Sequence, residues 1–152
     1  MEHSVSEVCR IGGLTCMGCC GREYGEREEI EKAVWQNTHE FNRSPGRLSF
    51  RERQGAKFLR SCGVCRQVIF TSQARDAVTC PLHPQENGGK DLRVGHCDIR
   101  YLCKAAVLFS EWDEKTRDAF VSFIHHKDLD WFTFSMGMDS DALVDEFLET
   151  YG

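Results

Sequence analysis

Three stretches of the chain repeat apolar residues every three or four positions, the spacing that places them on one face of a helix. The first runs from about Arg27 to Asn37 and opens with acidic residues, as helix N-termini favour. The second runs from Asp113 to Lys127, and the third follows Ser140, a good N-cap residue. We therefore predict three helices with these inward residues: Ile30, Ala33 and Val34; Ala119, Phe120, Phe123 and Ile124; Leu143, Val144, Phe147 and Leu148.

Three further segments give shorter patterns. The segment from Cys97 to Phe109 predicts a helix on which Cys103 faces inward, towards the core or a metal. The segment from Cys65 to Ser72 is apolar and β-favouring at its centre, so it predicts a short strand. From Asp130 to Met136 the apolar residues alternate, which also predicts a strand. The inward residues expected are Ile99, Leu102, Cys103, Ala106 and Val107 in the helix, Val68, Ile69 and Phe70 in the first strand, and Phe132, Phe134 and Met136 in the second.

Loops occupy much of the remaining chain. Asn42 to Arg47 is a turn by its Ser-Pro-Gly content, Gly55 interrupts any continuous helix after it, and Pro81 to Gly95 is a long polar loop. We expect an α+β fold: a small, metal-stabilised, helix-rich single domain over residues 1–152, with short strands and long cysteine-bearing loops. Its cysteine part would span about 9–109, and its aromatic, acidic helical part about 110–152.

Length and composition suit one globular domain. The chain has 152 residues, of which 41% are hydrophobic, and no apolar run approaches the roughly 18 residues that a membrane span needs. The first residues, MEHSVSEVCRIGG, contain acids and no continuous apolar stretch, unlike a secretory signal. We expect a cytoplasmic protein without a membrane partner.

Nine cysteines in a chain of this length is far above ordinary usage. Their number is odd and no export signal is visible, so metal binding or catalysis is favoured over disulfides. Cys16-Met-Gly-Cys19 and Cys62-Gly-Val-Cys65 are both C-x2-C pairs, which let two thiolates converge on one ion. Cys9 lies in an N-terminal arm and is interpreted as a spare thiol. The candidate metal ligands are Cys16, Cys19, Cys20, Cys62, Cys65, Cys80, Cys97 and Cys103.

The order of several motifs resembles a known family. A C-x2-C-C group is followed by an acidic helix, then by a Cys-Pro pair, a Cys-x-Ile segment and a last Cys before a base; the matching residues are Cys16, Cys19, Cys20, Cys80, Pro81, Cys97, Ile99, Cys103 and Lys104. This order resembles the YkgJ-type cysteine-cluster family, described as zinc- or iron-chelating proteins. The resemblance covers about residues 16–107. It implies an iron–sulfur or zinc site built from the six cysteines of these motifs.

The choice of metal stays open at this point. Sulfur-only ligands suit both zinc and iron–sulfur clusters. Adjacent thiolates such as Cys19 and Cys20 point in different directions and rarely serve one tetrahedral ion, so we prefer an iron–sulfur cluster to zinc. His83 and His96, each near a cysteine in sequence, are further candidate ligands for zinc. The pair His125-His126 ends a helix and is interpreted as structural.

Charge is unevenly distributed although the net value is −5. From Arg43 to Arg66 there are seven Lys or Arg residues against one acid, whereas Glu111 to Gly152 holds eleven acids against three bases. We expect the basic residues to pair with the acidic C-terminal part. The alternative is that Arg47 to Arg66, with its interleaved phenylalanines, binds nucleic acid or an acidic protein partner.

Three function classes follow. The first is a metal-binding protein with an iron–sulfur or zinc centre that serves in electron transfer, sensing or maturation. The second is a zinc-stabilised interaction module that uses the basic stretch. The third is a thiol-redox or cluster-dependent enzyme, since C-x2-C also occurs in redox proteins. The phosphate-binding loop GxxxxGK[ST] and the nucleophile elbow G-x-S-x-G are both absent from the chain, so those enzyme classes receive no support.

Overall fold

The computed structural model describes residues 10–11, 14–17, 23–53, 59–71, 74, 76–93 and 103–151. Within these residues it is a helix-rich α+β structure with six α-helices, one 3-10 helix and two small antiparallel sheets. In chain order the elements are β1 (Arg10–Ile11), β2 (Leu14–Thr15), α1 (Arg27–Arg43), α2 (Arg47–Glu52), β3 (Ile69–Phe70), β4 (Val78–Thr79), η3 (Pro84–Glu86), α3 (Lys104–Glu111), α4 (Glu114–Lys127), α5 (Trp131–Asp139) and α6 (Ala142–Tyr151).

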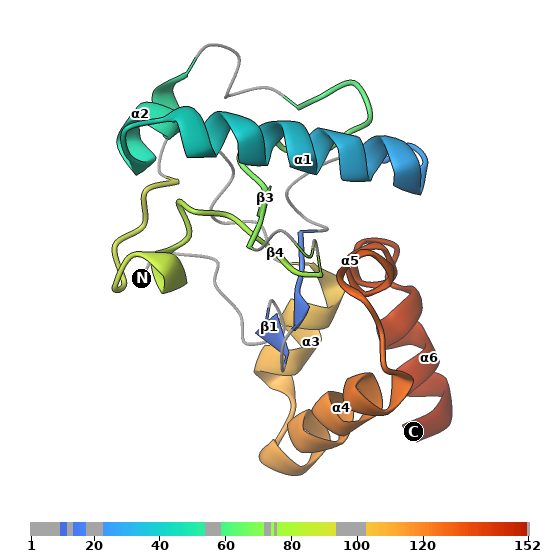
Figure 1. Cartoon of the computed structure of the whole chain (residues 1–152). Coiled ribbons are helices and arrows are strands. Elements are labelled where there is room, and N and C mark those ends of the chain that lie inside the picture. The colour runs from blue at the N-terminus through green and yellow to red at the C-terminus, as the bar shows by residue number, and fades with distance from the viewer. Residues whose placement is uncertain are drawn as a thin grey trace.

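The strands lie between one long helix and a group of four helices (Figure 1). Helix α1 crosses one end of the molecule and packs against β3, with α2 beside it. Helices α3 to α6 occupy the other end, where α4 contacts β1 and α5 contacts β2. Strand β1 pairs with β2, and β3 pairs with β4. Each strand is only two residues long, so the sheets contribute few backbone hydrogen bonds.

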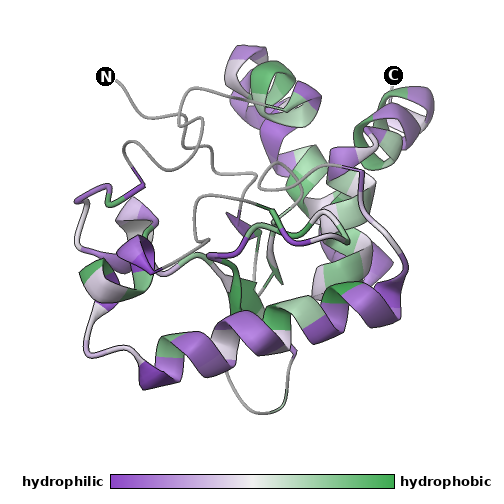
Figure 2. Ribbon diagram, turned by 90° about the horizontal axis from the view of Figure 1, so that it is seen from above, coloured by the Kyte–Doolittle hydropathy of each residue, from purple (hydrophilic) through white to green (hydrophobic). Residues whose placement is uncertain are grey.

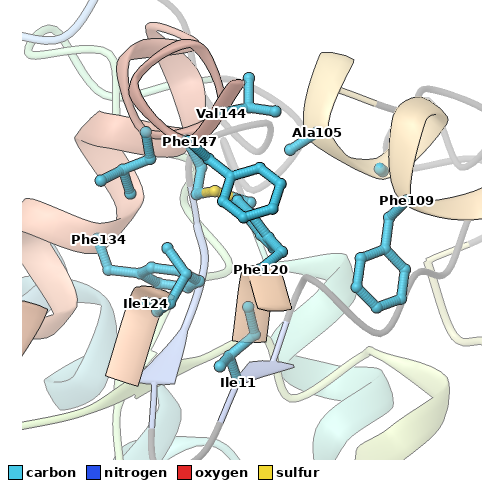
Figure 3. Close-up of a cluster of buried hydrophobic side chains, with 11 residues drawn as sticks. Ile11, Ala105, Phe109, Phe120, Ile124, Phe134, Val144 and Phe147 are labelled. Atoms are coloured by element: carbon cyan, nitrogen blue, oxygen red, sulfur yellow. The ribbon is translucent and has the colours of Figure 1, made fainter. Parts of the chain in front are cut away.

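The helices α3 to α6 enclose a core that we call the aromatic cluster. Phe120 lies at its centre, fully buried, with Phe147 and Phe109 around it (Figure 3). The Phe120 ring centroid is 5.2 Å from that of Phe147 and 5.6 Å from that of Trp112, within the range of favourable aromatic pairs. The buried members are Ile11, Ala105, Ala106, Phe109, Phe120, Ile124, Phe134, Met138, Leu143, Val144 and Phe147.

A second core, which we call the α1–β3 cluster, fills the space under α1. Ile30 and Val34 face it from the helix and are fully buried. Figure 2 shows hydrophobic residues on the side of α1 that meets β3 and hydrophilic residues on its outer side. The buried members are Met17, Ile30, Ala33, Val34, Cys62, Val64, Val68, Phe70, Val78 and Trp131.

Helix α5 contributes to both cores. Phe134 and Met138 belong to the aromatic cluster, whereas Trp131 belongs to the α1–β3 cluster and meets Phe70 with ring centroids 5.5 Å apart. Asp130, which precedes the helix, accepts a hydrogen bond from the backbone amide of Thr133 and so caps its N-terminus. Helix α5 therefore joins the two cores, and so does the segment at β2, where Cys16 packs against the aromatic cluster and Met17 belongs to the α1–β3 cluster.

Three helices predicted from periodicity are confirmed in position. Helix α1 begins at Arg27 as expected but continues to Arg43, so the turn predicted for Asn42 to Arg47 shrinks to residues 44–46. Helices α4 and α6 match the other two predictions, and their inward residues reach the aromatic cluster, with Ala119 and Phe123 only partly buried. Ser140, expected as the N-cap of the last helix, is instead the C-cap of α5, and α6 begins at Ala142. Leu148 is an exception, since it is 40% exposed.

The strand predicted from Asp130 to Met136 is wrong, because this segment forms helix α5. Phe132, Phe134 and Met136 alternate because the whole segment is rich in apolar residues. The positions that are buried include Trp131, Phe134 and Met138, and their spacing is helical. The capping carboxylate of Asp130 supplies a helix start that the alternation pattern ignores.

The helix predicted within Cys97 to Phe109 is described from Lys104 onward, as α3, and Cys103 is its N-cap. Ala106 is buried as expected, but Val107 is 41% exposed, and Ile99 and Leu102 lie outside the described residues. Strand β3 confirms the first predicted strand in a shorter form, and its partner β4 was not predicted. Among the described residues, every helix is too short or too polar to cross a membrane.

Candidate metal centre

The second C-x2-C motif forms a tight turn. The amide of Gly63 donates to the Arg60 carbonyl, and the amide of Arg60 donates to the Val64 carbonyl, both at 2.8 Å. Gly63 has φ of 94°, a left-handed backbone that glycine adopts without steric cost. Leu59 and Cys65 face each other in an isolated antiparallel bridge. The turn therefore reverses the chain between the two cysteines and places Cys62 and Cys65 on one compact structure.

The two sulfurs of this turn have different hydrogen-bonding surroundings. The backbone amide of Gln67 donates to Cys65 Sγ at 3.5 Å, a bond that favours negative charge on the sulfur. The Cys62 thiol donates to the Glu29 carbonyl of α1 at 3.6 Å. Cys62 is buried and Cys65 is partly buried. Backbone amides that donate to a cysteine sulfur two residues earlier suit a thiolate metal ligand.

Helix α1 supports the turn through Asn37, whose side chain is fully buried. Its amide nitrogen donates to the carbonyls of Cys65, at 2.9 Å, and Val68, at 2.8 Å. Its amide oxygen accepts from Nε of Arg60 at 2.8 Å. Asn37 therefore satisfies its donors and its acceptor on residues at both ends of the turn, as a buried amide requires.

Glu40, one helical turn after Asn37, adds charge to this support. Its two carboxylate oxygens pair with Arg53, at 2.7 Å, and Arg60, at 3.1 Å. Partial burial would raise the pKa of Glu40, but hydrogen bonds from Gln36, Arg53 and Arg60 outweigh burial and lower the pKa to about 2. The carboxylate is thus ionised at neutral pH and holds two arginines that flank the turn.

The first C-x2-C motif begins next to this turn. Met17 is buried in the α1–β3 cluster together with Cys62, and its amide donates to Ser135 Oγ of α5 at 3.0 Å. Tyr24 donates its hydroxyl to the Met17 carbonyl, and the amide of Gly25 donates to the Cys62 carbonyl at 2.9 Å. Met17 and Gly25, which lie on either side of residues 18–22 in the sequence, are therefore both fixed beside the second motif.

Cys16 and Cys103 belong to the other core. Both are partly buried, and both pack against the aromatic cluster. Cys103 is the N-cap of α3, where the positive end of the helix dipole favours an anionic sulfur. The prediction that Cys103 faces inward is therefore confirmed in part, since it reaches the edge of the core and is not fully buried.

Cys80 directly follows β4, at a location separate from both the Cys62–Cys65 turn and the pair Cys16 and Cys103. The His83 amide donates to the Cys80 carbonyl at 3.0 Å, which closes a turn across Cys80-Pro-Leu-His83. Burial is the main cause that lowers the pKa of His83, to about 4, with Arg93 and Arg10 adding repulsion. Its imidazole is neutral at pH 7, the form that binds metals.

The five described candidate cysteines are not gathered into one site. Among the residues that the structure describes, no three Cys, His, Asp or Glu side chains are placed so that they could hold a metal ion together. Cys62 and Cys65 share one turn, Cys16 and Cys103 share the edge of the aromatic cluster, and Cys80 stands elsewhere. A complete centre therefore requires donors from the candidates that lie outside the described residues: Cys19, Cys20, Cys97 and His96. Cys9 lies outside them as well.

Among the residues that the structure describes, the arginines of the basic stretch pair with α1, with Glu52 and with loop carbonyls, and not with the acidic C-terminal part. Besides the Glu40 pairs, Arg47 donates to the Pro81 carbonyl and Arg51 donates to the Leu92 carbonyl. We expected these basic residues to pair within the molecule, which the described arginines do. The predicted partner, the acidic C-terminal part, was wrong, because these arginines meet Glu40 of α1 and loop carbonyls instead. Lys57 lies outside the described residues.

Asn37, which supports the turn, was not among the residues predicted from the sequence. The signal was present, because Asn37 follows Ile30 by seven positions and Val34 by three, on the apolar stripe of α1. A polar residue on such a stripe is buried and needs hydrogen-bond partners, so it marks a place where another segment docks.

No family model, no curated protein and no solved structure matches this chain. The resemblance to the YkgJ-type family therefore stays a prediction that rests on the quoted motifs.

Proposed function

We propose that this chain is a metal-binding protein in which the Cys62–Cys65 turn supplies two thiolates to a structural metal ion. The observation that carries the proposal is the turn itself, a C-x2-C reversal with glycine in a left-handed conformation and a backbone amide donating to Cys65 Sγ. A C-x2-C turn can bring two thiolates to one cation, and here the amide of Gln67 stabilises charge on Cys65 Sγ.

Chain connectivity supports the first motif as the source of further ligands. Cys19 follows Met17 by two positions, and Met17 packs in the same cluster as Cys62. Gly25, on the other side, is hydrogen-bonded to the Cys62 backbone. Donors from this motif would then join segments that are distant in sequence, as structural metal sites commonly do.

The burial of the turn favours a structural role over an exposed reactive one. Cys62 is buried beneath α1, and Val64 between the two cysteines is fully buried in the α1–β3 cluster. Structural zinc sites are closed in this way, whereas catalytic zinc keeps an open position. The sequence favoured an iron–sulfur cluster because Cys19 and Cys20 are adjacent, but the closed, buried turn favours a single tetrahedral zinc ion instead. An iron–sulfur cluster is the alternative that the experiment separates.

Metal analysis of purified chain tests this proposal. Protein is purified without oxygen, its zinc and iron are measured per chain, and acid-labile sulfide is assayed. We expect zinc without labile sulfide, and a lower metal content in Cys65→Ser. Ser61→Ala, which changes the exposed neighbour of Cys62, serves as the matched control and should keep the wild-type content.

If the protein contains iron and labile sulfide, the thiolate site holds an iron–sulfur cluster and not zinc. A wild-type chain that holds no metal and shows no sulfur-to-cobalt absorption when titrated with Co²⁺ would overturn the proposal.

A further inference from the structure

We propose that Asn37 is a positioning residue for the Cys62–Cys65 turn, and that it sets the metal affinity of the two thiolates without touching the metal. This inference rests on the metal-binding function proposed above. It concerns a residue of α1, a helix whose sequence contains no cysteine.

Asn37 holds the backbone on both sides of the amide that faces the sulfur. Its side-chain nitrogen bridges the carbonyls of Cys65 and Val68, and the Gln67 amide that donates to Cys65 Sγ lies between these two residues in the chain. Fixing both carbonyls fixes the orientation of the intervening peptide units. The direction of the hydrogen bond to the sulfur therefore depends on Asn37.

The same side chain also holds the entrance of the turn. Arg60, two residues before Cys62, donates from Nε to the Asn37 oxygen, while its NH2 group reaches Glu40. Two carbonyls on one side and a guanidinium on the other admit only one orientation of the amide. One fully buried side chain thus joins the segments that enter and leave the cysteine pair.

If Asn37 only stabilised the fold, its loss would lower stability without changing metal affinity. Thr38, its neighbour on α1, provides the comparison. Thr38 is also buried on α1, and its hydroxyl accepts a hydrogen bond from the amide of Phe70 in β3 at 2.9 Å. Thr38→Val removes a buried hydrogen bond between α1 and β3 without touching Cys65 or Val68. It is therefore a matched control for Asn37→Ala.

The experiment is a Co²⁺ titration of the full-length metal-free chain, followed by the sulfur-to-cobalt charge-transfer absorption, with thermal unfolding of each variant measured in parallel. We expect Asn37→Ala to weaken Co²⁺ binding by about 10- to 100-fold, the effect of removing groups that orient metal ligands. Its charge-transfer band should also weaken or shift. Thr38→Val should lower the melting temperature but change the Co²⁺ affinity less than about threefold, because the cysteine geometry is untouched.

Arg60→Met provides a second variant, should Asn37→Ala fail to fold. It removes the donor to the Asn37 oxygen from a side chain at the rim of the core, and we expect weaker Co²⁺ binding in the same direction as for Asn37→Ala. Equal Co²⁺ affinities in wild type, Arg60→Met and any folded Asn37 variant would overturn the inference. A wild-type chain without charge-transfer absorption would instead overturn the metal site itself, so the two failures are distinguishable.

Discussion

The two cores of the molecule are built in different ways. In the aromatic cluster, four consecutive helices supply their own backbone hydrogen bonds, and Phe, Trp and aliphatic side chains fill the space between them. In the α1–β3 cluster a single long helix covers loops and two-residue strands. There side chains of α1 hold the segments that they cover: Asn37 donates to the Cys65 carbonyl, Thr38 accepts from the Phe70 amide of β3, and Glu40 pairs with the arginine side chains beside the turn. A region with so little regular structure gains most from a metal crosslink.

The largest expected effect comes from the centre of the aromatic cluster. Phe120→Ala removes a fully buried ring that contacts the rings of Phe109, Trp112, Phe123 and Phe147. We expect a loss of about 3–5 kcal/mol in the free energy of unfolding, from lost burial and a cavity. Urea denaturation followed by tryptophan fluorescence measures it.

Because the metal is proposed to lie in the cysteine part, the stability lost in Phe120→Ala should not depend on the metal. The destabilisation by Phe120→Ala should be the same in metal-loaded and in chelated protein. A much larger loss in chelated protein would mean that the aromatic cluster also depends on the metal.

The next effect concerns Glu40 and its dependence on pH. The folded pKa of about 2 lies below the ordinary value of 4.5, so the folded state binds its proton less readily than the unfolded chain. The stabilising contribution of Glu40 is therefore complete above about pH 4.5 and is lost as the pH falls towards 2. We expect Glu40→Gln to cost on the order of 1–2 kcal/mol at pH 7, allowing for solvent screening of the partly exposed pairs.

Denaturation of wild type and Glu40→Gln at pH 7 and at pH 3 measures this contribution. The difference between the two proteins should shrink at the lower pH. A difference that stays constant with pH would show that the carboxylate charge is not what holds Arg53 and Arg60.

The smallest effect is expected where the two regions meet. Asp130 caps α5 and also pairs with Arg27 of α1 at 2.6 Å. Burial alone would raise the pKa of Asp130, but the amide and hydroxyl of Thr133 and the Arg27 guanidinium lower it. We expect Asp130→Ala to cost about 1 kcal/mol, mostly through the lost cap, since exposed ion pairs contribute little.

A double-mutant cycle with Arg27→Met isolates the link between α1 and α5. The coupling between the two positions should be small, below about 0.5 kcal/mol. A coupling of several times that size would mean that the ion pair, and not the shared packing of Trp131, joins the two regions.

The helices were largely predictable because their apolar spacing is decided locally. Phe120 and Ile124 in α4, and Ile30 and Val34 in α1, face their cores as the pattern indicates. Helix α5 was misread because Phe132, Phe134 and Met136 alternate within a segment that is apolar on most sides. There the decisive signal was the capping carboxylate of Asp130.

The candidate site was predictable only in its donor atoms. The spacing of Cys62 and Cys65 identified a turn that can present two thiolates, but the partner segments come from tertiary packing. Met17 reaches the turn because Ser135 and Tyr24 fix its backbone, and no local pattern encodes that contact. Likewise Arg53 and Arg60 pair with Glu40 because α1 packs beside the turn. The distribution of charge along the sequence did not indicate this pairing.

The most direct test of the difference between the two regions is amide hydrogen exchange with and without a strong chelator. If a thiolate-bound metal holds the cysteine part, chelation should raise exchange at least about tenfold in residues 59–71, which contain the Cys62–Cys65 turn, and leave α4 nearly unchanged. Unchanged exchange in residues 59–71 of protein shown to have lost its metal, or an equal rise in α4, would contradict the account.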